Sequence, residues 1–265
     1  MQHFDDTSLD VLDSDITLWR AVVRTSRSAA AIGEPCEEIW TCRRGMGVLR
    51  LLLHGDHLGF FTELARSAQC RRYYLSRCAA EQYFDFYCTS SRSEPYFDAL
   101  AASCFDLACA LGRLSPPSFR DGEEYEDDFL YLRFLHRWVE ATASNVELSA
   151  IMRQIERVLD GASSARLEVC KAFHARDGAA FERAFSSLLE ERLVEVDGEK
   201  RGIADDSVCA AAGTYVFVEG IALLRLAGAM GFPTRLEYPL CPSLSRLPMT
   251  GTVPVDEFVF PAPGP

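Results

Sequence analysis

The stretch Ser144–Gly161, SNVELSAIMRQIERVLDG, carries a full set of helix signals and decides the fold class. Ser144 followed three residues later by Glu147 is a capping box, which satisfies free backbone N–H groups at a helix start. Gly161 suits the end of a helix because glycine readily adopts the left-handed conformation found there. Between these ends, apolar side chains recur at the spacing of one helix face: Leu148, Ile151, Met152, Ile155, Val158 and Leu159. The stretch is therefore predicted to be an amphipathic α-helix.

The same spacing recurs along most of the chain. Further apolar stripes occupy segments 16–23, 48–53, 58–68, 74–86, 97–111, 129–139, 167–173, 181–189 and 208–230. We therefore expect an all-α fold, a single domain over 1–265 whose helical body, 8–231, packs about nine helices as stacked antiparallel pairs. Segment 97–111 carries few charges, which predicts a central helix that is buried on most sides.

Two short segments read as tight turns between antiparallel helices. His54-Gly55-Asp56 precedes Phe60 and Phe61, and a similar stretch, His174–Gly178, precedes Phe181. In both, an aspartate stands where its side chain can cap the second helix: Asp56 and Asp177. The two turns suit stacked helix pairs, although two of them do not make a repeat family.

Two regions are expected to lie outside the helices. The polar stretch 195–206 is the predicted long loop. It leads to a last predicted helix at 208–230, although the β-branched residues within 214–218 would also suit a strand. Eight of the 12 prolines fall between Pro233 and Pro265. Because proline removes a backbone donor and breaks helices, segment 232–265 should run extended over the helical body.

The charge balance narrows the classes of partner. The net charge is −12, so the surface should repel nucleic acid and anionic membranes and attract a basic protein. The longest uncharged apolar run, 208–218, is shorter than the roughly 20 residues that a membrane span needs. The polar, acidic opening MQHFDD does not resemble a signal peptide, and a cytoplasmic protein is expected.

The 10 cysteines form no Cys-x-x-Cys motif and no zinc spacing with histidine. Several lie among apolar residues at helical spacing, where a free thiol behaves as a small hydrophobe: Cys70, Cys78, Cys104, Cys109 and Cys170. Reduced core cysteines are the favoured interpretation, and a disulfide-stapled secreted protein is the alternative.

The densest concentration of charge is the run 121–128, DGEEYEDD, with six carboxylates in eight residues and no Lys or Arg. Such charges repel one another, so the run is expected to face water or a cationic partner. A solvated loop and helix start explain it as well, since carboxylates favour the first turn of a helix. The predicted partner-binding residues are Asp121, Glu123, Glu124, Tyr125, Glu126, Asp127 and Asp128.

Catalytic and metal-binding patterns are weak. His54 and His57, in His-Gly-Asp-His, are the best metal candidates, but a site also needs a third ligand, and Asp56 is better used as a cap. His136 and His174 have structural explanations, and no nucleophile motif is present. We therefore expect no catalytic residues, no metal and no cofactor.

The second half of the chain resembles the immunity protein 49 family of bacterial polymorphic-toxin systems. The resemblance rests on helix 148–155, on KAFHARD at 171–177, on the amphipathic helix 181–191, and on VEGIALLRLA at 218–227 followed by Gly231-Phe232-Pro233 and LEYPLCP at 236–242. It covers roughly residues 130 to 245. The family implies a cytoplasmic protein that binds and neutralises a cognate secreted toxin, and it supplies no catalytic residues.

Three functions remain open. The first is a toxin inhibitor whose acidic surface meets a basic partner, such as a nuclease-type domain, with Tyr125 as an aromatic anchor. The second is a helical scaffold or regulatory module unrelated to toxins. The third is an enzyme that uses histidines near Asp56 or Asp177 as acid–base groups. A homodimer also stays open.

Overall fold

A computed structural model describes residues 4–201 and 207–259 of the chain. Within these residues it contains α-helices and short 3-10 helices and no strand, which confirms the all-α prediction. The α-helices are α1 (Asp6–Thr25), α2 (Gly33–His54), α3 (His57–Glu81), α4 (Glu94–Ala101), α5 (Phe105–Leu114), α6 (Glu126–Val139), α7 (Asn145–Leu159), α8 (Ala165–Ala175), α9 (Gly178–Arg201), α10 (Val208–Gly213) and α11 (Val218–Ala229). The 3-10 helices are η1 (Ala29–Ala31), η2 (Phe86–Cys88) and η3 (Ser243–Arg246).

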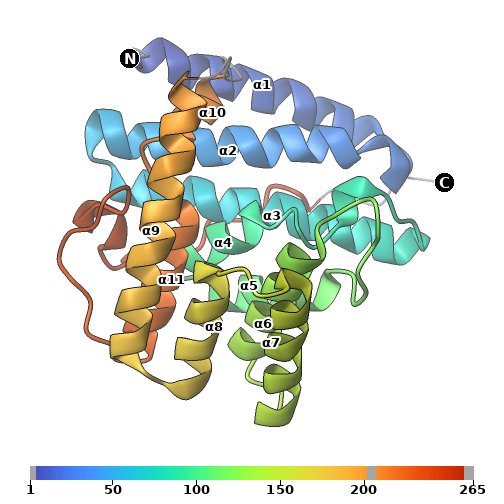
Figure 1. Cartoon of the computed structure of the whole chain (residues 1–265). Coiled ribbons are helices and arrows are strands. Elements are labelled where there is room, and N and C mark those ends of the chain that lie inside the picture. The colour runs from blue at the N-terminus through green and yellow to red at the C-terminus, as the bar shows by residue number, and fades with distance from the viewer. Residues whose placement is uncertain (1–3, 202–206, 260–265) are drawn as a thin grey trace.

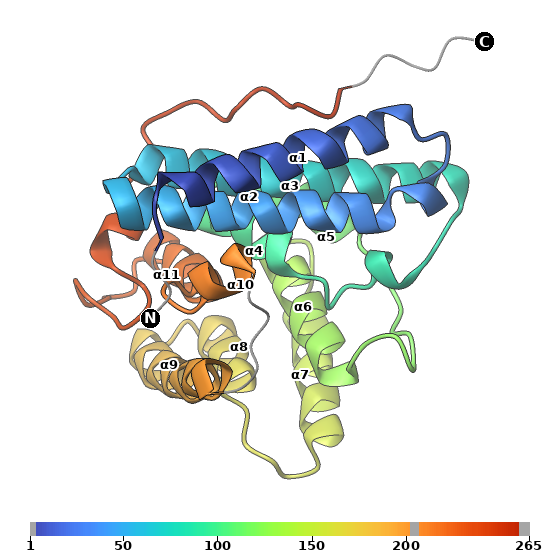
Figure 2. The same cartoon turned by 90° about the horizontal axis from the view of Figure 1, so that it is seen from above.

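The helices form layers. The long helices α1, α2 and α3 lie side by side, and α4, α10 and α11 lie between them and the group α6–α9 (Figure 1 and Figure 2). Every residue of α4 from Pro95 to Ala101 is buried, as is nearly all of α11. The prediction of a buried, central helix near residue 97 is therefore correct for α4.

The two predicted interhelical turns are present with their caps. After α2, Gly55 adopts φ +64° and the Asp56 side chain accepts a hydrogen bond of 2.8 Å from the Gly59 N–H. After α8, the Asp177 side chain accepts from the N–H groups of Ala179 and Ala180, both at 2.9 Å. Each cap satisfies donors that a helix start leaves free.

The helix boundaries differ from the predictions in four places. Segments 58–68 and 74–86, expected as two helices, form the single helix α3 up to Glu81. Segment 97–111 is divided into α4 and α5 at Ser103, whose φ of +58° ends α4, while the Cys104 N–H reaches back to the Ala99 carbonyl. These contacts are a helix-ending motif that is usually built on glycine.

The last predicted helix, 208–230, is also divided. Residues 214–217 form a turn between α10 and α11, neither helix nor strand, and the Phe217 N–H donates to the Leu240 carbonyl of the C-terminal segment. The predicted loop 195–206 is wrong over its first part, since α9 continues to Arg201. Its remainder, 202–206, lies outside the described residues.

After α11 the chain crosses the molecule without further α-helix within the described residues. Its first part packs beside α9 and α11, where the Tyr238 hydroxyl donates to Glu182 at 2.7 Å and Arg225 donates to the Arg246 carbonyl at 2.9 Å. Its last described part runs along the opposite side of the α1–α3 layer (Figure 2). The prediction of a non-helical tail over the helices holds here except for the single turn η3, and residues 260–265 lie outside the described part.

All ten cysteines are free thiols, and eight of them are buried. Cys70, Cys78, Cys104 and Cys170 belong to the apolar core, whereas Cys109 is only half-buried. The buried thiols therefore act as small apolar side chains, as the helical spacing predicts.

Candidate partner-binding surface

The acidic run begins in the loop after α5 and ends in the first turn of α6, which Glu126, Asp127 and Asp128 form. These three carboxylates lie beside the free N–H groups of the helix start, where the helix dipole favours negative charge. Asp121 and Glu126 are exposed, and the Tyr125 side chain is 79% exposed. This part of the run faces solvent as predicted.

Two carboxylates of the run turn inward, so the expectation that the whole run faces water is wrong. Glu124 accepts a hydrogen bond of 3.0 Å from the Ser91 N–H, and burial raises its pKa. Asp128 accepts from Arg166 at 2.8 Å, and burial, partly offset by Arg166, raises its pKa. Both carboxylates find donors inside the fold, which compensates for the lost hydration. Glu123 and Asp127 are half-buried.

Arg166, on α8, joins three elements through a partly buried network. Its Nε and Nη2 atoms donate to the two carboxylate oxygens of Glu219 at 3.0 and 2.7 Å, while Nη1 holds Asp128. The Tyr131 hydroxyl also donates to Glu219, at 3.0 Å, and Glu219 is only 8% exposed. The bidentate geometry and the additional donor are what the buried Glu219 carboxylate needs to offset its desolvation.

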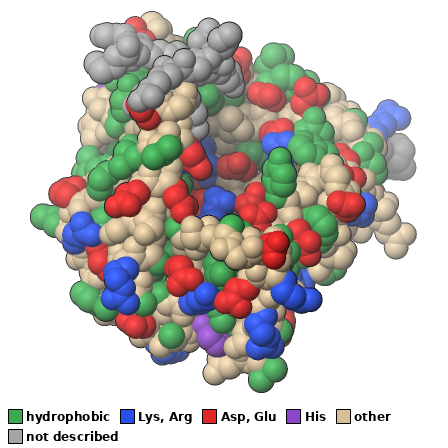
Figure 3. Space-filling model, in the orientation of Figure 1, with side chains coloured by type: hydrophobic (Ala, Val, Ile, Leu, Met, Phe, Trp, Pro, Cys, Tyr) green, Lys and Arg blue, Asp and Glu red, His purple; other side chains and the backbone are tan. Residues whose placement is uncertain are grey.

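This network forms one wall of a cleft of about 390 Å³ between α2, α4, α6, α8 and α11. A second hollow, of about 290 Å³, shares Arg166, Arg192 and Glu195 with the cleft. A third, of about 1130 Å³, runs along α8 and α9 and shares Ser163 and Glu191 with the second. We call these three adjoining hollows the acidic furrow. Figure 3 shows acidic and basic side chains close together around a depression on this face.

The charged residues of the furrow are mainly acidic, with ten carboxylates against five cations. The carboxylates are Glu94, Asp127, Asp128, Glu156, Glu168, Asp177, Glu190, Glu191, Glu195 and Glu219, and the cations are Arg44, Arg166, Lys171, Arg183 and Arg192. Several form internal pairs, but Asp127, Glu190 and Glu191 have no ion-pair partner among the described residues. The furrow therefore presents net negative potential to solvent.

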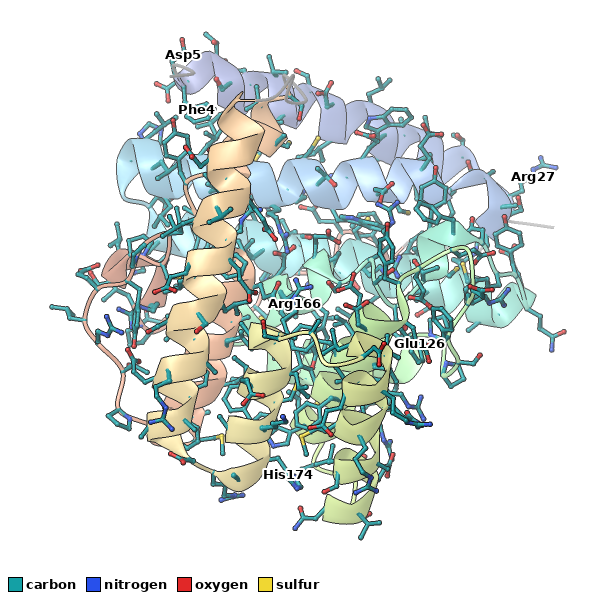
Figure 4. The ribbon with its side chains drawn as sticks, viewed as in Figure 1. Phe4, Asp5, Arg27, Glu126, Arg166 and His174 are labelled. Atoms are coloured by element: carbon teal, nitrogen blue, oxygen red, sulfur yellow. The ribbon has the colours of Figure 1, made fainter. Side chains whose placement is uncertain are left out.

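The furrow and the acidic run belong to one surface. Asp127 and Asp128 contribute to both, and Figure 4 shows Glu126 and Arg166 on neighbouring helices of the same face. The exposed residues Tyr125 and Glu126 directly precede Asp127 at the edge of the furrow, and Asp121 is exposed earlier in the same run. Sequence reasoning found the run but missed Arg166 and Glu219, although a single carboxylate in the apolar segment 218–229 is a signal for a buried partner.

The described histidines do not assemble into one site. His54 pairs with Asp6 at 2.9 Å, while His57 packs edge-on against Phe61. His174 shares a hydrogen bond of 3.1 Å with Ser149. The structure has no group of three or more His, Cys, Asp or Glu side chains with metal-binding geometry in the part of the chain that it describes.

His136 is buried between α5 and α6, with its ring 4.5 Å from that of Tyr96. Burial, reinforced by Arg133 and Arg71, lowers the pKa of His136 to about 3. The ring is therefore neutral near pH 7, which fits a core histidine.

Comparison with known families assigns the chain to one of them. The family model described as immunity protein 49 matches residues 88–244, more than half of the sequence, and the chain belongs to this family. The match begins well before residue 130, where the sequence resemblance began, and it contains the acidic run and the whole furrow except its α2 side. Membership implies an immunity function, the neutralisation of a toxin. Neither the curated proteins nor the solved structures gave a match.

None of the described helices is both long and apolar enough to cross a bilayer.

Proposed function

We propose that the chain neutralises its cognate toxin by direct contact, without catalysis, and that the acidic run and the furrow form the contact surface. The observation that carries this proposal is that the exposed residues Tyr125 and Glu126 directly precede Asp127, which lines a furrow with ten carboxylates and five cations. Apart from the α2 side of the furrow, this surface lies within the part of the chain that matches the immunity family.

The chemistry of the surface favours a basic partner. A negative field speeds the approach of a positively charged protein, and its effect falls as salt screens it. Asp127, Glu190 and Glu191 are available to bind lysine or arginine side chains, since no described cation pairs with them. A toxin domain that itself binds nucleic acid, such as a nuclease, carries the positive charge that this surface requires.

Tyr125 is the proposed anchor of the contact. Its side chain is 79% exposed although it lies between residues that the fold holds in place: Glu124 is bonded to Ser91, and Asp128 is bonded to Arg166. Tyrosine contributes strongly at interface centres because it buries a large ring and keeps a polar hydroxyl. A fixed backbone with an exposed ring reduces the entropy lost on binding.

Charge reversal tests the proposal. The variant Asp121→Lys/Glu126→Lys changes only exposed carboxylates, so the fold should be kept. We expect its association rate with a cognate toxin domain to fall about tenfold at low salt, with a smaller change at high salt. Stopped-flow or surface-plasmon measurements over a salt series give this rate.

The matched control is Asp10→Lys/Asp13→Lys, which makes the same change in net charge on exposed positions of α1. Asp5, just before this helix, lies far from Glu126 in Figure 4. Equal losses of association rate in the two double variants would show that only net charge matters and would contradict the proposed contact surface. If the wild-type chain does not rescue growth of cells that express the toxin domain, the pairing itself is wrong.

A further inference from the structure

The segment Val253–Phe258 lies on α1, α2 and α3, on the side of this layer that faces away from α6–α9 (Figure 2). The Pro254 carbonyl accepts a hydrogen bond of 2.9 Å from the Gln69 side chain, and Asp256 pairs with Arg72. Phe258 is 4% exposed, with its ring 5.5 Å from that of Tyr73. The described contacts of the segment thus include a backbone carbonyl, a carboxylate and an aromatic ring.

Glu257 is the centre of this contact. Its carboxylate is 2.7 Å from Arg43 Nη2, 3.0 Å from Arg66 Nε and 3.3 Å from Arg20 Nη1. The three arginines come from α2, α3 and α1, so one carboxylate joins three helices. Arg43 is only 4% exposed, and its Nη1 atom holds the buried Glu63 at 2.7 Å.

The arginine group requires a carboxylate ligand. Without segment 253–258, Glu63 would be the only carboxylate left among the ion-pair partners described for Arg20, Arg43, Arg66 and Arg72. This concentration of positive charge stands out in a chain of net charge −12. A buried guanidinium such as that of Arg43 is costly when part of its charge is uncompensated.

The segment itself has the properties of a bound peptide. Val255 is 89% exposed and Val253 is 53% exposed, so alternate side chains point away from the helices. Pro254, Asp256 and Glu257 are half-buried, and Phe258 is buried.

We propose that the α1–α3 face is a binding site for a short acidic peptide with an Asp-Glu-Phe core, and that the chain's own segment 253–258 occupies it as a detachable ligand. The site is separate from the acidic furrow and does not depend on the function proposed above. Attachment in cis gives the segment an effective concentration on the order of millimolar, so a free peptide competes poorly until the segment is released.

Peptide binding in trans tests this. The probe is a fluorescein-labelled peptide of residues 250–259, and the receptors are the full wild-type chain and the full-chain variant Glu257→Gln/Phe258→Ala, whose own segment is weakened. By fluorescence anisotropy we expect saturable binding to the variant, at least tenfold tighter than to the wild-type chain, and weaker at high salt. If the double variant loses its helical circular dichroism, Phe258→Ala alone replaces it.

Two peptides serve as matched controls. A peptide with Glu257→Gln should lose binding to the variant, whereas one with Val255→Ala should bind like the original, since Val255 faces solvent. The absence of binding to a folded variant would show that the segment is an integral part of the fold. Equal affinity for both receptors, or equal affinity of the Glu257→Gln peptide, would place binding elsewhere and overturn the proposal.

Discussion

At the scale of single residues, the burial of Glu219 could be predicted from the sequence, but its partner could not. Glu219 is the only acidic residue in α11, and a single carboxylate in an apolar helix indicates a buried partner. That partner, Arg166, lies 53 residues earlier, and no spacing rule connects the two. The acidic run is visible in the sequence, but the donors that bind Glu124 and Asp128 are known only once the chain is folded.

The Tyr131 hydroxyl should stabilise the network around Glu219. Tyr131→Phe removes a donor to a buried carboxylate while the ring stays in place, so we expect the free energy of unfolding to fall by about 1–3 kcal/mol. Urea unfolding followed by circular dichroism measures this loss. Tyr125→Phe is the control and should leave stability unchanged, because that side chain is 79% exposed. Equal effects would show that the buried hydrogen bond contributes nothing.

His136 should make the fold sensitive to acid. Its pKa is lowered to about 3 by burial, whereas a histidine in an unfolded chain titrates near 6.5. Between these two pH values the histidine is protonated in the unfolded chain but neutral in the folded one. The stability that neutral His136 contributes is therefore fully present above about pH 6.5 and is lost as the pH falls toward 3.

The measurement is the free energy of unfolding from pH 7 to pH 4. His136→Gln should reduce its slope by up to about 1.4 kcal/mol per pH unit relative to the wild-type chain. His174→Gln, at a half-exposed position bonded to Ser149, is the comparison variant. An unchanged slope in His136→Gln would show that this histidine does not titrate with unfolding.

At the scale of elements, periodicity and capping residues predicted where helices form, and they failed where helices divide. The caps at Asp56 and Asp177 follow local rules and were found. The division of α4 from α5 at Ser103 was missed because serine is not a typical residue for a positive φ. Segment 195–201 was taken as loop because it is polar, but its Glu, Lys and Arg residues are good helix formers.

Ser103 offers a test of this division. Because its φ is +58°, Ser103→Gly should relieve strain and raise the free energy of unfolding by up to about 1 kcal/mol. The same change at Ser187, exposed within α9, should instead lower it by about 0.5 kcal/mol, since glycine weakens a helix interior. Thermal or urea unfolding of both variants shows whether each change raises or lowers the free energy of unfolding. A loss of stability in both would contradict the backbone assigned to Ser103.

At the scale of the whole molecule, an excess of carboxylates lines one face and a group of arginines lies on another. The furrow gathers carboxylates from α4, α6, α8, α9 and α11, while the α1–α3 face gathers arginines that the C-terminal segment neutralises. The net charge and the proline-rich end of the sequence indicated an acidic protein with a non-helical tail. The furrow was not predictable, because it forms between segments that are far apart in the chain.

The most direct test of the proposed contact surface is amide hydrogen exchange of the complex with the cognate toxin domain. We expect binding to slow exchange in 120–128, at the start of α8 and along 190–195, and to leave the exposed side of α1 unchanged. Protection confined to α1–α3, with exchange in 120–128 unaltered, would contradict the assignment of the acidic run and furrow as the toxin-binding surface.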